Sequence, residues 1–85
     1  MPPNSSSLIP DRFRAWIEAA EIEVAKAKSS AAARFFTGYL DGLEAGAVTF
    51  GTAAFDLLDT EAEGTFGDYG EGFRKGLMNI EFVSA

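Results

Sequence analysis

The 85-residue sequence contains no cysteine and no histidine, and these two absences exclude several classes of functional site. Without cysteine the chain can form neither a disulfide nor a thiolate metal centre. Without histidine it lacks the commonest metal ligand and the commonest general base of enzymes. Any metal site would therefore consist of oxygen ligands, which suit calcium or magnesium rather than zinc or copper. A chain without cysteine also fits a reducing compartment, so we expect a cytoplasmic protein.

Long hydrophobic runs are missing as well, and we expect no leader segment. No stretch approaches the roughly 20 apolar residues that a membrane span needs. Residues 1–7 have neither the basic cluster nor the apolar run of a signal peptide. Their Pro, Ser and Asn residues predict a flexible N-terminal arm over 1–9, attached to a single helical domain within 1–85.

The chain is nevertheless too apolar to be disordered, because 47% of its residues are hydrophobic and eight are Phe. A domain of this length buries roughly 60% of its unfolded surface, so its core alone is marginal. Small domains usually add a disulfide, a metal or a partner subunit. With disulfides excluded, we expect a homo-oligomer.

Apolar residues recur at helical spacing along most of the chain, which predicts an all-α bundle of three or four short helices. A first helix is expected over about 11–28, and a second follows the serine pair at 29–30, where a serine can cap it. Because neither Gly nor Pro stands at that pair, one long helix through residue 44, with the first two helices merged, is the alternative.

The second half of the chain predicts two further helices. One is expected over about 49–58, and the last begins at Asp68, which forms a possible capping box with Glu71. The stretch 59–67 between them is predicted to be an acidic loop, and residues 83–85 are predicted to fray.

Glycines recur at a spacing of four within the expected second and last helices, at Gly38, Gly42, Gly46, Gly72 and Gly76. Each glycine inside a helix costs roughly 1 kcal/mol relative to Ala, so a compensating interaction is expected. A spacing of four places the glycines on one side, where another helix backbone can approach closely. We predict a close helix–helix contact, within the chain or between chains. The alternative is that Gly42 and Gly46 simply end the second helix.

The aromatic residues outnumber what a small core needs, and a surplus on the surface would mark an interface. Phe35 and Phe36 are adjacent, so both cannot point directly inward, and one of them is predicted to contact another chain. The predicted interface thus combines these two phenylalanines with the five glycines. Segments 36–43 and 69–77 both place glycines among aromatic residues, and we interpret them as two packing surfaces of the same style.

Residues 54–66 resemble the entering helix and loop of an EF-hand. In that resemblance Asp59, Glu61 and Glu63 occupy the first three ligand positions, and Gly64 stands where the loop turns. The resemblance implies that these three carboxylates and the Thr65 carbonyl bind calcium. Position twelve of the loop is Gly70 rather than the usual Glu, and Glu71 follows one residue later. The alternative function is therefore a calcium-binding protein with one degenerate loop at 59–71.

Charge is distributed unevenly along the chain. Residues 1–40 carry five bases and four acids, a net of +1, while residues 41–85 carry two bases and nine acids, a net of −7, which together give −6. An acidic half repels nucleic acid and anionic membrane and attracts basic partners. A basic partner surface would meet Asp56, Asp59, Glu61, Glu63 and Asp68. Simple solubility is the alternative explanation of these charges.

The same inventory argues against catalysis. Serines and threonines are present, but no histidine can activate them, and the glycine spacings lack the residues of a phosphate-binding loop. We therefore expect a non-enzymatic protein–protein interaction module that acts in assembly or inhibition through helix packing and an acidic surface. In size and charge it resembles small inhibitors encoded by phages and mobile elements.

Overall fold

The computed structural model describes residues 9–84, and within that range the chain forms four helices and no strand. They are α1 (Asp11–Lys26), α2 (Ser30–Thr49), α3 (Ala53–Glu63) and α4 (Gly67–Ser84). The predicted all-α bundle is thereby confirmed. The predicted arm lies outside the described residues except for Ile9, which is buried in the core rather than flexible.

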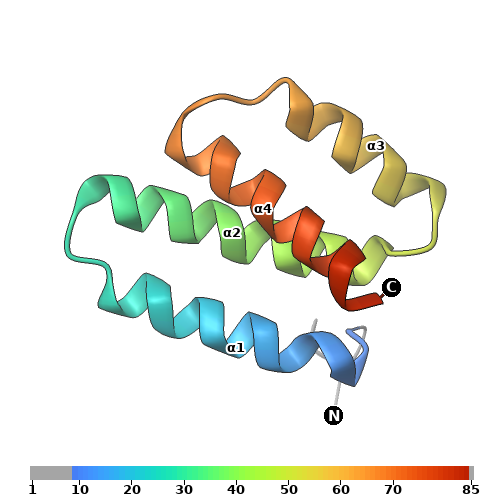
Figure 1. The fold of residues 1–85 in the computed structure, drawn as a ribbon, viewed down its shortest axis with the longest axis horizontal. Coiled ribbons are helices and arrows are strands. Elements are labelled where there is room, and N and C mark those ends of the chain that lie inside the picture. The colour runs from blue at the N-terminus through green and yellow to red at the C-terminus, as the bar shows by residue number, and fades with distance from the viewer. Residues whose placement is uncertain (1–8, 85) are drawn as a thin grey trace, which may run out of the picture.

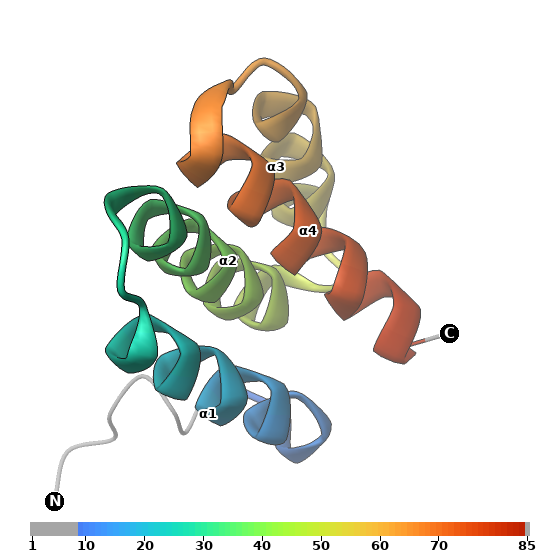
Figure 2. The same cartoon turned by 60° about the vertical axis from the view of Figure 1, so that its left-hand side comes forward.

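Helix α2 lies between α1 and α4, and α3 lies on the outer side of α4 (Figures 1 and 2). Helices α2 and α4 run in the same direction, so the chain must return between them, and α3 provides that return (Figure 1). No charged or polar side chain is buried among the described residues. The core consists of ten apolar residues: Ile9, Phe13, Ile17, Ala20, Leu43, Ala47, Phe55, Ala62, Leu77 and Ile80.

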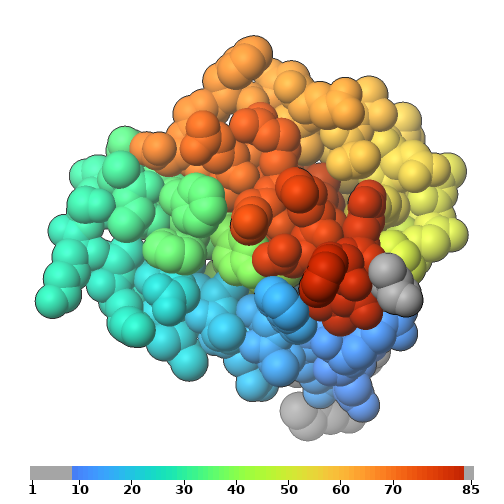
Figure 3. Space-filling view, viewed as in Figure 1, coloured from blue at the N-terminus to red at the C-terminus, as the bar shows by residue number. Residues whose placement is uncertain are grey.

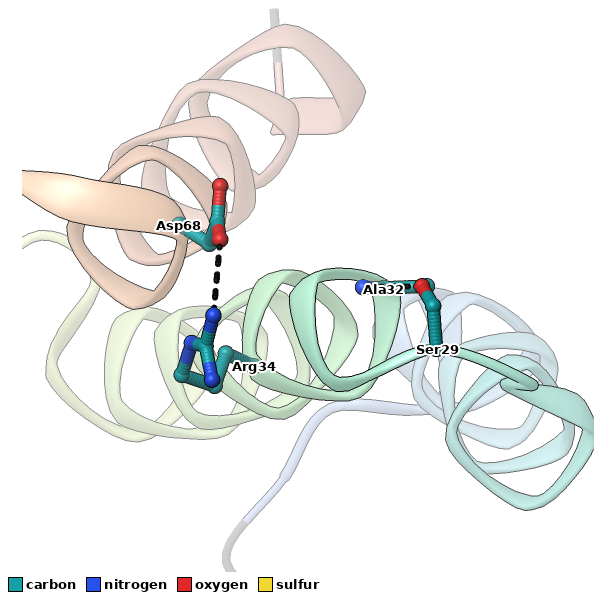
Figure 4. A network of polar contacts seen from close by, with 4 residues as sticks. All are labelled: Ser29, Ala32, Arg34 and Asp68. Atoms are coloured by element: carbon teal, nitrogen blue, oxygen red, sulfur yellow. Dashed lines mark hydrogen bonds and ion pairs between the residues drawn. The ribbon is translucent and has the colours of Figure 1, made fainter.

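Helices α1 and α2 are separate, so the alternative of one merged helix is wrong. Helix α1 ends at Lys26, and Ala27 has an extended backbone. Ser29 then caps α2, because its hydroxyl accepts a hydrogen bond of 3.0 Å from the Ala32 N–H (Figure 4). This is the serine cap that the sequence predicts.

Helix α2 continues to Thr49, through Gly42 and Gly46, so the interpretation of these glycines as a helix end is also wrong. The chain turns instead at Gly51, whose φ of +83° is a conformation that suits glycine. Helix α3 follows from Ala53, which is four residues later than the predicted start at 49.

The acidic stretch predicted as a loop is mostly helical, because α3 runs on to Glu63. Its residue Ala62 is buried, and this contact with the core holds the last turn. The Arg74 guanidinium donates hydrogen bonds to the carbonyls of Ala62 and Thr65, which satisfies acceptors at the end of α3. Helix α4 begins at Gly67, so Asp68 lies inside its first turn and not at its cap, and α4 extends to Ser84 without the expected fraying at 83.

Candidate functional site: a protein-interaction surface

The glycines predicted as an interface lie inside the molecule, between α2 and α4. Gly38, Gly42, Gly72 and Gly76 are all buried. A Cβ atom on any of them would stand closer than 3.0 Å to a backbone carbonyl oxygen of the facing helix. Gly46 is also buried, but it faces side chains of the core. The close helix–helix contact is thus made within the chain, and a second chain cannot reach these glycines in this fold.

The four backbone contacts form two reciprocal pairs. In the first pair, Gly38 faces the Tyr69 carbonyl, and Gly72 faces the Phe35 carbonyl. The two glycines are 34 residues apart in the sequence, and so are the two residues whose carbonyls they face. The same displacement relates the other two contacts, in which Gly42 faces the Phe73 carbonyl and Gly76 the Tyr39 carbonyl. The two similar segments of the sequence therefore pack against each other.

An ion pair and two ring pairs follow the same relationship. Arg34 Nη2 lies 3.4 Å from Asp68 Oδ2, and this ion pair joins the N-terminal parts of α2 and α4 (Figure 4). The ring centroids of Phe35 and Tyr39 are 6.4 Å apart on α2, and those of Tyr69 and Phe73 are 6.3 Å apart on α4. Asp68 thus has an ion-pair partner within the chain, and a basic protein would have to compete with Arg34 for it.

Phe35 and Phe36 are both half-buried, and neither is among the exposed aromatic residues. Their rings pack edge to face with centroids 5.3 Å apart. The adjacency argument correctly predicts that both cannot be fully buried.

The proposed calcium ligands are not arranged as in a calcium-binding loop. Asp59, Glu61 and Glu63 all belong to α3, where alternate residues point to different sides. In the described part of the chain, no group of three or more acidic side chains could hold a metal ion. The expectation of an EF-hand-like loop at 59–71 is therefore wrong, because the first five of these residues belong to α3. Without the three carboxylates gathered in a loop, Thr65 and Glu71 have no ligand set to complete.

A small polar cluster joins α2 to α4 at Asp41 and Tyr69. The Tyr69 hydroxyl donates a hydrogen bond of 2.5 Å to Asp41, and this bond, with some burial, raises the pKa of Tyr69 to about 12. One turn further, burial and then the nearby charges of Asp41 and Glu21 raise the pKa of Glu44. Folding therefore favours the protonated form of Glu44. The stabilisation from this form is present below the ordinary pKa of 4.5 and is lost as the pH rises through the raised pKa.

Several large apolar side chains remain exposed among the described residues. Met78 and Phe82, one turn apart on α4, are 62% and 76% exposed, and the exposed Glu81 lies beside them on the same helix. We call Met78, Glu81 and Phe82 the α4 patch. The second half of α4 lies on the face shown in Figure 3, next to α1. The other exposed large apolar residues are Trp16, Ile22, Val48, Leu57, Phe66 and Tyr69.

The α4 patch is missing from the predicted interface, although the sequence contains a signal for it. Helical spacing in the sequence places Tyr69, Phe73, Leu77 and Ile80 on one apolar stripe of the last helix. Leu77 and Ile80 are fully buried. Met78 and Phe82 stand one and two positions after these buried residues, so helical geometry turns them away from the core.

Comparisons with protein-family models, with curated proteins and with solved structures found no match. Within residues 9–84, none of the helices has the length and apolar character that crossing a membrane requires.

Proposed function

We propose that this chain is a non-enzymatic protein–protein interaction module that binds another protein through the α4 patch. The observation that carries the proposal is the exposure of Met78 and Phe82 on a helix whose opposite side is fixed to the core. Exposed side chains of this size lose unfavourable contact with water when a partner covers them. Methionine and phenylalanine are also enriched at the centres of protein interfaces.

Rigid support of the patch favours this role. The reciprocal glycine contacts bring α4 against the backbone of α2, so α4 cannot shift without separating two helices. A patch on a fixed helix loses little conformational entropy when it binds. The chain thus has the features of a small assembly or inhibitory protein.

Charge distinguishes between two kinds of partner. Asp56, Asp59, Glu61 and Glu63 are exposed on α3, and Glu81 belongs to the α4 patch itself. The exposed Lys75, one turn before Met78 on α4, offsets one of these five carboxylates and leaves a net charge of −4. This net charge would repel a second copy of the same surface and would attract a basic protein. We therefore favour a basic protein as the partner over a homo-oligomer that uses this face.

Site-specific photo-cross-linking tests the proposal. A photoreactive phenylalanine analogue at position 82 should form a discrete heavier adduct in cells that make the protein. The matched control carries the analogue at Ala31, which is exposed at the start of α2, far from the α4 patch. Equal adducts at both positions, or none at position 82, would contradict the proposal.

A further inference from the structure

A surface pocket of about 490 Å³ adjoins the α4 patch. It lies between the turn that joins α2 to α3 and the last turns of α4, and Glu81 belongs both to its lining and to the patch. Its apolar wall comes from Phe50 and Phe55, whose rings pack edge to face with centroids 5.4 Å apart. Phe50 is only half-buried, and it is one of the residues that line the pocket.

Two carboxylates from different helices line this pocket, Asp56 from α3 and Glu81 from α4. Both side chains are exposed, and neither makes an ion pair with any residue between 9 and 84. The pocket lining contains no lysine or arginine. The charge of the two carboxylates is therefore not balanced by a cation of the pocket itself.

The start of α3 also faces this region and contributes the opposite sign. Thr52 does not cap α3 with its side chain, because its hydroxyl donates instead to the Thr49 carbonyl at 2.6 Å. A helix N-terminus carries a partial charge of roughly +0.5. Two carboxylates outweigh it, so the pocket as a whole favours a cation.

We propose that this pocket receives an arginine side chain of the basic partner, an inference that rests on the function proposed above. An arginine guanidinium is planar, so it can pair with carboxylates at its edge while its face lies on an aromatic ring. Asp56 and Glu81 supply the carboxylates, and Phe50 supplies the ring. The pocket thereby selects a basic segment that places an arginine beside the residue covering Phe82.

The inference is tested with an acetylated and amidated tri-arginine peptide, titrated into the isotope-labelled protein and followed by amide NMR. The expected shifts are concentrated at Gly51, Thr52 and Ala53, which border the pocket. The double variant Asp56→Asn with Glu81→Gln should weaken binding about tenfold, since two charge pairings are lost. The corresponding tri-citrulline peptide, which has the same shape without charge, should cause no such shifts.

The matched control is Asp59→Asn with Glu63→Gln, which removes the same charge from α3 outside the pocket lining. It should weaken binding only about twofold, through the loss of general attraction. Equal weakening by both double variants, shifts away from the pocket, or absence of binding would overturn the inference. Cross-linking from position 82 does not depend on the pocket, so such a failure is distinguishable from failure of the proposed function.

Discussion

Gly72 lies directly against the backbone carbonyl of Phe35, and a contact of the same kind joins Gly38 to Tyr69. Together these contacts bring the first halves of α2 and α4 to backbone distance. Such an approach excludes any side chain between the helices, and it explains why glycines stand where each costs the helix roughly 1 kcal/mol. Tight packing between α2 and α4 offsets that cost.

The substitution Gly42→Ala should destabilise the protein by about 2 kcal/mol. The added methyl group would meet the Phe73 carbonyl, so the helices must separate, and this overpacking outweighs the gain in helix propensity. Gly46→Ala is the matched control, because it adds the same methyl group to the same helix but meets only side chains, at 3.1 Å and beyond. It should stay within about 1 kcal/mol of the wild type. Urea denaturation measures both, and equal effects would refute this explanation of the glycines.

The substitution Arg74→Met should cost about 1–2 kcal/mol of unfolding free energy. Its guanidinium donates to the carbonyls of Ala62 and Thr65 at the end of α3, and these acceptors would lose a charged donor. The neighbouring substitution Lys75→Met removes an equal charge from an exposed position and should be nearly neutral. Thermal unfolding followed by circular dichroism compares the two variants. Similar losses in both would show that charge alone matters.

Alkaline titration should reveal the hydrogen bond between Tyr69 and Asp41. Because the pKa of Tyr69 is raised to about 12 from an ordinary value of 10.0, folding favours its protonated form. The resulting stabilisation is fully present below pH 10 and is lost as the pH rises through about 12. Phenolate absorbance of the Tyr39→Phe variant isolates Tyr69. Ionisation complete near pH 10 in the folded protein would contradict the hydrogen bond.

Calcium should have no specific effect on this protein. Asp59, Glu61 and Glu63 are held on α3 and cannot converge on one ion without unwinding that helix. Calorimetric titration with calcium, and with magnesium as the control, should give no saturable heat. A saturable heat for calcium that Asp59→Ala abolishes would restore the calcium-binding alternative.

Much of the fold could be predicted from the sequence because helical periodicity and the Ser29 cap are local properties. The end of α3 could not be predicted in this way. Its charged residues indicate a solvated loop, whereas burial of Ala62 and the hydrogen bonds from Arg74 depend on the distant α4. Tertiary contacts of this kind override local composition.

The candidate site was harder to predict than the fold. Glycine spacing indicates a close helix contact, but it cannot tell whether the facing helix belongs to the same chain or to another. The exposure of Met78 and Phe82 depends on which residues of α4 face the core. That choice follows from the approach of Gly72 and Gly76 to α2, which only the three-dimensional arrangement provides.

The most direct test of the proposed function is the mass of the protein after gentle purification from the cells that make it. The mass is measured by light scattering as the protein elutes from a size-exclusion column. The wild type should elute in a complex heavier than its own 9.1 kDa, with a basic protein present. The double variant Met78→Ser with Phe82→Ser should lose that complex while staying folded. Ile22→Ser with Val48→Ser, which changes exposed residues on α1 and α2, should retain it. A monomeric wild type, or equal loss in both double variants, would contradict binding through the α4 patch.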